Sequence, residues 1–207
     1  MEDVISIYAK PYNPLIPVIC MDEQPIQLLG ETRDPIPATQ NHPVRVDYEY
    51  ERAGTASIFM FTEPLAGKRE VSVRSHRTKV DWAIEMEQLL RTQYANAEKI
   101  ILVCDNLNTH TRGAFYEAFP AEKAREIVQK IEFHYTPKHG SWLNMSEVEI
   151  SALTRQCLKA RIPVIKLLKR KVKKWQDKRN KERIKINWSF SKKDAKNVFP
   201  ELYSNGN

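Results

Sequence analysis

The sequence lacks any apolar run that approaches the roughly 20 residues needed for a transmembrane helix. Its N-terminal segment, residues 1–10, also lacks the apolar core of a signal peptide. Both absences argue against a membrane-spanning or secreted protein. We therefore expect a soluble protein in the cytoplasm that has no membrane partner.

Cysteine is scarce as well. Cys20, Cys104 and Cys157 lie in apolar segments without CxxC spacing, so we interpret them as core residues and not as disulfide partners or zinc ligands. With 207 residues, 42% hydrophobic and 29% charged, the chain can bury one substantial core. We predict a single domain over residues 1–207, with its core at about 15–160 and a basic helical C-terminal extension at about 161–207.

Acidic residues are nearly absent from one long segment close to the C-terminus. Residues 155–196 contain 17 Lys and Arg against three Asp and Glu, a net charge of +14. Residues 1–154 contain 16 Lys and Arg against 22 Asp and Glu, a net charge of −6. This asymmetry indicates a polyanionic partner held beside an acidic site. A solvated lysine-rich helix is the alternative.

Hydrophobic patterning predicts mainly strands in the first part of the chain. The expected strands cover residues 15–21, 44–52, 55–63 and 69–75, and the middle two form a hairpin around Ala53 and Gly54. Residues 23–43 are rich in Pro, Gln and Thr, and we expect them to form a long loop.

Helices and strands are expected to alternate in the rest of the chain. We predict helices over 78–96, 113–130 with a possible break at Pro120, 142–158 and 164–185, and strands over 100–104 and 131–135. Antiparallel strands followed by alternating helices and strands indicate an α/β fold with a mixed sheet covered on both faces. The C-terminal end, with Trp188 and Phe190, is expected to pack back on this domain.

The stretch IILVCDNLNTH at residues 100–110 indicates a functional site. Its five apolar residues predict a strand buried on both faces, and ligands bind at the carboxyl ends of such strands. Asp105 stands at this end, and Asp22 stands at the end of the strand expected over 15–21. As an alternative, Asp105 merely caps the turn after its strand.

A third carboxylate is available where the TPKHGS loop at 136–141 leads into a helix, from Glu147 or Glu149. With about 100° of rotation per residue, Glu147 lies within the apolar stripe that should face the sheet, and Glu149 lies at its margin, nearer to solvent. The stripe consists of Leu143, Ile150, Leu153, Cys157 and Leu158. As an alternative, Glu147 forms a capping box with Asn144 as the N-cap.

Three carboxylates that converge on one point repel one another strongly unless divalent cations lie between them. Oxygen ligands without a His or Cys cluster suit magnesium or manganese. A pair of such ions can activate an attacking oxygen and stabilise a leaving oxygen in phosphodiester chemistry. We therefore expect magnesium at this site.

Three sequence blocks carry a family resemblance. CMDEQP around Asp22, VCDNLNTH around Asp105 and YTPKHGSWLNMSEVE around Glu147 resemble the acidic blocks of DDE transposases, in particular the bacterial insertion-sequence group related to mariner elements. The resemblance extends over residues 8–203. It implies an RNase H-like fold, cut-and-paste DNA transposition, insertion at TA dinucleotides, and a homodimer on paired element ends.

The resemblance also implies which residues act. Asp22, Asp105 and Glu147 would be the catalytic ligands of two magnesium ions, with manganese as a substitute. Water would cleave the phosphodiester at the element end, and the freed 3′ hydroxyl would then attack target DNA. Glu149 would match a helix position without a catalytic role.

The chain departs from the family pattern in two ways. Asp105 and Glu147 are separated by 41 residues, more than we expect for mariner relatives. The segment before Asp22 is too short for the helix-turn-helix modules with which such transposases recognise terminal repeats. We therefore expect a catalytic domain without this N-terminal DNA-binding region.

Other residues are candidates for supporting roles. Asn106 and His110 could orient a metal-bound water or contact a phosphate, or they could serve only the turn; Asn144 is the third supporting candidate. The basic residues that could contact DNA are Lys138, His139, Lys166, Lys169, Arg170, Lys173 and Lys174. The last five share one face of the helix expected after Pro163, whose opposite face carries Val164, Leu167, Leu168, Val172 and Trp175.

The prediction is a magnesium-dependent transposase catalytic domain that acts on element ends and target DNA in the cytoplasm, in association with the nucleoid. Two alternatives remain at this point. One is a non-enzymatic DNA-binding remnant of a transposase, and the other is a different RNase H-like nuclease, such as a resolvase.

Overall fold

The computed structural model describes residues 1–203 and has a five-stranded sheet at its centre, with strand order β3-β2-β1-β4-β5. The strands are β1 (Val18–Glu31), β2 (Tyr50–Glu63), β3 (Lys68–Arg74), β4 (Ile100–Cys104) and β5 (Ile131–Tyr135). β1, β2 and β3 pair antiparallel, whereas β4 pairs parallel with both β1 and β5. The predicted mixed sheet is confirmed.

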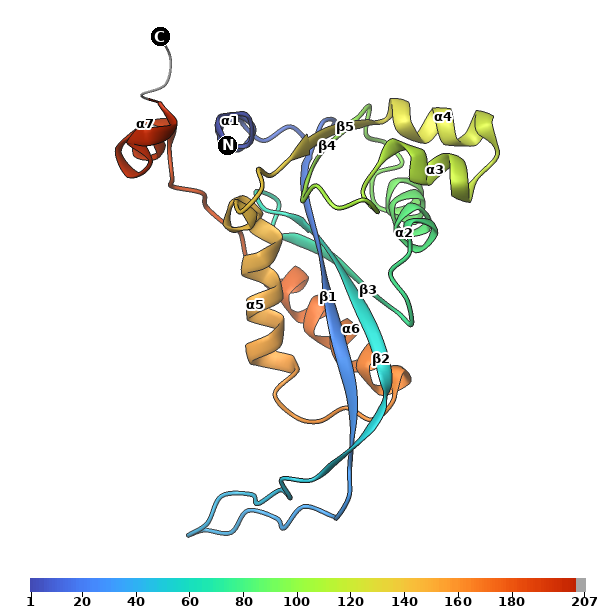
Figure 1. Ribbon diagram of the computed structural model, residues 1–207, viewed down its shortest axis with the longest axis vertical. Helices are drawn as coiled ribbons and strands as arrows, with labels where there is room; N and C mark the ends of the chain where they lie inside the picture. The colour runs from blue at the N-terminus through green and yellow to red at the C-terminus, as the bar shows by residue number, and fades with distance from the viewer. Residues whose placement is uncertain (204–207) are drawn as a thin grey trace.

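Helices cover both faces of this sheet (Figure 1). One face is covered by α2 (Lys79–Thr92), α3 (Arg112–Ala118) and α4 (Ala121–Gln129), and the other by α5 (Met145–Cys157) and α6 (Ile165–Glu182). α1 (Glu2–Tyr8) and α7 (Lys192–Val198) pack together at one end of the molecule. In the described residues, no helix is both long enough and apolar enough to cross a membrane.

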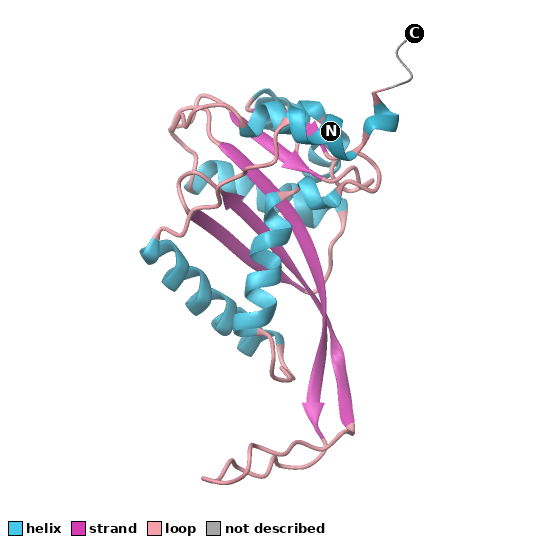
Figure 2. Cartoon of the chain, turned by 90° about the vertical axis from the view of Figure 1, so that its left-hand side faces the viewer, coloured by secondary structure: helices cyan, strands magenta, loops and turns pink. Residues whose placement is uncertain are grey.

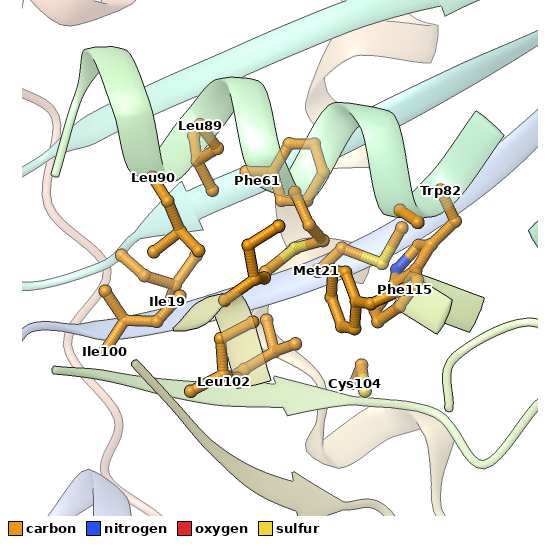
Figure 3. Packing of buried hydrophobic residues seen from close by; sticks show 14 of the residues in the cluster. Ile19, Met21, Phe61, Trp82, Leu89, Leu90, Ile100, Leu102, Cys104 and Phe115 are labelled. Atoms are coloured by element: carbon orange, nitrogen blue, oxygen red, sulfur yellow. The ribbon is translucent and has the colours of Figure 1, made fainter. Parts of the chain in front are cut away.

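The largest part of the core lies between the sheet and α2 (Figure 3). Met21 from β1 and Trp82 from α2 are both fully buried there, and the ring centroids of Trp82 and Phe115 are 5.0 Å apart. The first turn of α2 is closed by a capping box between Thr78 and Asp81. This packing fixes the position of β1 and β4 relative to the helices.

The predicted loop over 23–43 is wrong in its first part, because β1 continues through Asp22 to Glu31. Its pairing with β2 runs from Cys20 opposite Thr62 to Glu31 opposite Tyr50, and Leu28 is buried under α5 and α6. These tertiary contacts override the weak strand propensity of a segment rich in Pro and Gln. Asp22 therefore lies inside a strand and not at its end.

The predicted hairpin at Ala53 and Gly54 is also wrong, because β2 runs straight through both residues. The register against β1 shifts there, so the turn signal marks a β-bulge, and Gly54 adopts a φ of 108° that favours glycine. β1 and β2 thus form one long arm that projects beyond the helices (Figure 2). The actual connecting loop covers residues 32–49.

Other predicted elements are confirmed with shifted boundaries. The break at Pro120 separates α3 from α4, and α2 ends at Thr92, four residues earlier than expected. The helix expected from Trp142 starts as a 3-10 turn, η1 (Ser141–Leu143), followed by α5. The rings of Trp188 and Trp142 are stacked with their centroids 6.3 Å apart, so the C-terminal segment packs back on the domain as predicted. Residues 204–207 of the predicted extension lie outside the described residues.

Glu149 is fully buried, which contradicts its predicted place near solvent. Arg69 from β3 and Arg179 from α6 both donate to its Oε1 at 2.8 Å, and Arg179 also donates to Oε2 at 2.9 Å. Burial raises the pKa of Glu149, but the hydrogen bonds from both arginines outweigh it and hold the pKa below the usual range. Glu149 therefore joins the sheet to α5 and α6.

Glu149→Gln should lower the free energy of unfolding by about 3–5 kcal/mol, because two guanidinium groups lose their buried counter-charge. Urea denaturation followed by circular dichroism measures this change. Val148→Ala is the matched control, since Val148 is 49% exposed and its truncation should cost about 0.5 kcal/mol or less. Equal stability of Glu149→Gln and wild type would show that the buried network contributes nothing.

Candidate active site

Asp22 and Asp105 are brought together by the parallel pairing of β1 and β4. Cys20 lies opposite Val103 in this pairing, so the same register two residues further on places Asp22 level with Asp105 and on the same face. Neighbouring strands lie about 4.8 Å apart. The prediction that these two aspartates share one site is therefore supported by strand geometry, although Asp22 lies within its strand.

Glu147 is positioned by the first turn of α5, which is attached directly to β1. Asn144 Nδ2 donates to the main-chain oxygen of Met21 at 2.7 Å, and Ser146 Oγ donates to that of Cys20 at 2.7 Å. Asn144 is also the N-cap, since its Oδ1 accepts from the Ser146 N–H at 3.1 Å. Half-buried Glu147 follows in the same turn, close enough to Asp22 for its charge to affect the pKa of Asp22.

The charges of the three carboxylates act on one another. Burial raises the pKa of Asp22 to about 6, the N–H of Glu23 opposes this shift, and repulsion by Asp105 and Glu147 adds to it. Within residues 1–203, neither Asp22 nor Glu147 forms an ion pair with a basic side chain. Asp22 and Glu147 therefore contribute negative charge that no ion pair in this part of the chain balances, whereas Asp105 lies beside His110.

This donor set fits a divalent cation, although the carboxylates are not yet closed around one. No three His, Cys, Asp or Glu side chains of the described chain lie close enough together to hold a metal ion. The buried Oδ1 of Asp105 lies 2.6 Å from His110 Nδ1, while the Asp105 side chain as a whole is still 30% exposed. A partly exposed carboxylate beside a second carboxylate with a raised pKa is chemically suited to a hard cation such as magnesium.

His110 is buried behind Asp105 and is accompanied by an acid that the sequence analysis missed. Its Nδ1 lies 2.6 Å from Asp105 Oδ1, and its Nε2 lies 3.2 Å from Glu23 Oε1. Burial lowers the pKa of His110, but hydrogen bonds to Asp105, Cys104 and Glu23 outweigh it and raise the pKa to about 11. No sequence pattern connects Glu23 with His110, since only the fold brings them together.

The other candidate residues are at the surface. Asn106, Lys138 and His139 are exposed in the loops that follow β4 and β5. The five basic candidates on α6 are exposed as predicted: Lys166, Lys169, Arg170, Lys173 and Lys174. On the packed side of that helix, Leu168, Val172 and Trp175 are buried, but Val164 is 53% exposed because it precedes the helix.

Comparison with known proteins gives one family match. A family model described as DDE superfamily endonuclease matches residues 17–169, a segment that contains all three carboxylates. No curated protein sequence matches the chain.

The solved structures that resemble this fold include several of the Mos1 mariner transposase. Its paired end complex with Mn matches with a TM-score of 0.58 at 15% identity, covering 88% of this chain and 55% of that chain. Its catalytic domain matches with a TM-score of 0.56 at 10% identity, covering 88% of this chain and 87% of that chain. Its paired end complex with Mg matches with a TM-score of 0.51 at 14% identity, covering 88% of this chain and 58% of that chain.

These matches confirm the predicted RNase H-like fold. The chain spans little more than half the length of the Mos1 chains in the paired end complexes.

The raised pKa of Asp22 predicts a pH-dependent loss of stability in the metal-free protein. Its protonated form favours the folded state, so this contribution is complete below pH 3.8 and is lost as the pH rises to about 6. Asp22→Asn should remove the loss and stabilise the protein at pH 7 by about 1–3 kcal/mol. Urea denaturation in EDTA at pH 4 and 7 measures the effect.

Asp34→Asn serves as the control, because Asp34 is exposed in the loop at 32–49 and should give no comparable gain at pH 7. If Asp22→Asn is no more stable than wild type at pH 7, burial and the neighbouring carboxylates do not raise the pKa of Asp22.

Proposed function

Because the chain belongs to the DDE superfamily of endonucleases, we propose that it is the catalytic domain of a DNA transposase. The proposal is supported chiefly by the parallel register that brings Asp22 level with Asp105, and by the charges of Asp105 and Glu147, which both act on Asp22. The RNase H-like fold and the basic surface of α6 add support.

We assign two magnesium ions, with manganese as a substitute, to these three carboxylates. Bound there, the ions supply activation of the attacking oxygen and stabilisation of the leaving oxygen. The carboxylates of Asp22, Asp105 and Glu147 would hold these cations, while the attachment of α5 to β1 keeps Glu147 in place. The related Mos1 complexes that contain Mn and Mg support the choice of metal.

The proposed reaction has two phosphodiester steps. Water attacks the phosphodiester at the element end, which frees a 3′ hydroxyl, and this hydroxyl then attacks a phosphodiester of the target DNA. No covalent bond to the protein is required in either step. Two copies of the chain would act on paired element ends, and we expect them beside the nucleoid in the cytoplasm.

DNA contact is assigned to two exposed basic regions. Lys138 and His139 precede η1 and α5 and would lie closest to the carboxylates. The helix α6 also packs against β3. There, Gln176 and Asn180 accept hydrogen bonds from the N–H groups of Val71 and Arg69, both at 2.8 Å. This anchoring presents the basic side chains on a rigid helix, as a track for DNA phosphates.

Asp105→Asn and Glu147→Gln should each reduce magnesium-dependent cleavage and strand joining by about 10³-fold or more, because each removes a metal ligand. A gel assay with DNA that carries element ends measures both products. Glu122→Gln is the control, since Glu122 is exposed on α4. Circular dichroism should show that all three variants are folded.

The outcomes also separate the alternative functions. Full activity in Asp105→Asn would refute the carboxylate assignment. A wild-type protein that binds DNA without cutting it would indicate a non-enzymatic remnant, and cleavage without strand joining would indicate another RNase H-like nuclease.

Replacing Lys166, Lys169 and Arg170 with Ala should weaken DNA binding and reduce the slope of log K against log salt by about 2–3, because each lost phosphate contact contributes about 0.9. Fluorescence anisotropy over a series of salt concentrations measures this slope. The matched control replaces Lys79, Lys99 and Lys123, which removes the same charge from lysines paired with Glu117, Glu132 and Glu87. Equal slopes in the two triple variants would show that α6 does not contact DNA.

A further inference from the structure

Asp22 and Glu23 are consecutive in β1, so their side chains point to opposite faces of the sheet. Asp22 faces α5 and the other carboxylates, whereas Glu23 lies on the side covered by α2. His110 connects these two sides beyond the end of β4. Its ring lies between Asp105, with Nδ1 at 2.6 Å from Oδ1, and Glu23, with Nε2 at 3.2 Å from Oε1.

The ring of His110 is held on several sides. Its side chain is 0% exposed, and its centroid lies 5.4 Å from that of the Trp82 ring. The main chain of His110 is fixed as well, because its carbonyl accepts from the Tyr135 hydroxyl at 2.9 Å and its N–H donates to Leu107 at 3.0 Å. A ring that is enclosed in this way, with both nitrogens engaged, cannot contact a DNA phosphate.

Among residues 1–203, the side chain of Glu23 has one close partner, His110. Its side chain is 2% exposed, and its Oε2 lacks a hydrogen bond, with only Arg77 Nη1 at 3.9 Å. A buried carboxylate in this situation is costly unless it is paired with a cation. Arg77, Glu23, His110 and Asp105 therefore follow one another from the surface to the site.

We propose that His110 is a positioning residue that fixes the carboxylate of Asp105 for metal binding, and that Glu23 fixes the ring of His110 from behind. The inference rests on the proposed function, because it takes Asp105 as a metal ligand. Carboxylates that bind metals are themselves oriented by hydrogen bonds, and loss of such a partner lowers metal affinity about 10–100-fold. Neither His110 nor Glu23 contacts metal or DNA in this arrangement.

Isothermal titration of the full chain with Mn²⁺, without DNA, tests the role. His110→Leu removes both contacts and should weaken Mn²⁺ binding about 10–100-fold. His110→Asn retains an N–H donor close to the Nδ1 position and should recover part of the affinity. Glu23→Gln should give an intermediate loss, because it keeps the size of the side chain and removes its charge.

Two further variants make the outcomes distinguishable. Glu122→Gln removes the charge of an exposed carboxylate on α4 and should leave Mn²⁺ affinity unchanged. Asp105→Asn should lose Mn²⁺ binding. If Asp105→Asn loses binding while His110→Leu keeps wild-type affinity, the positioning role is wrong and the proposed function stands.

If Asp105→Asn keeps wild-type affinity, the metal site itself is wrong, and the positioning role fails with it. If His110→Leu does not fold, His110→Asn and Glu23→Gln decide the matter, since wild-type Mn²⁺ affinity in both would overturn the role.

Discussion

Two hydrogen bonds from the first turn of α5 to the main chain of β1 determine the geometry of the site. Asn144 and Ser146 donate to the carbonyls of Met21 and Cys20, and both donors are buried. A shift of α5 along the sheet would leave these groups unpaired, at a cost of about 1–3 kcal/mol each. These two bonds therefore hold the first turn of α5, and Glu147 with it, beside Asp22.

Two glutamates separated by one residue on α5 have opposite roles for a physical reason. Glu149 faces inward, and its charge is balanced by Arg69 and Arg179. Glu147 sits at the helix start, and its charge, with that of Asp105, adds to the burial that raises the pKa of Asp22. The first carboxylate stabilises the fold, whereas the second adds to a charge imbalance that a divalent cation can relieve. The same helix thus anchors the domain and presents a ligand.

Local sequence patterns were sufficient to predict several parts of the structure. The apolar run before Asp105 predicted β4, and Pro120 predicted the break between α3 and α4. Asn144, considered as the N-cap of a capping box with Glu147, is the N-cap, but its side chain accepts from the N–H of Ser146. These features depend on residues close together in the chain. The grouping of Asp22, Asp105 and Glu147 came from the family resemblance as well as from the strand ends.

The features that could not be predicted depend on distant partners. The residues at the Gly54 bulge have the sequence pattern of a turn, and only the pairing of β2 with β1 shows that the strand continues through them. The burial of Glu149 requires arginines from β3 and α6, and the contact between Glu23 and His110 joins residues 87 positions apart. In each case a long-range contact outweighs the local preference, and a single sequence carries no signal for it.

The most direct test of the metal site is a crystal structure of the protein soaked with Mn²⁺, with anomalous diffraction recorded above the manganese absorption edge. The account predicts anomalous peaks about 2.2 Å from carboxylate oxygens of Asp22, Asp105 and Glu147. Manganese bound by other side chains, with no peak at these three, would contradict it.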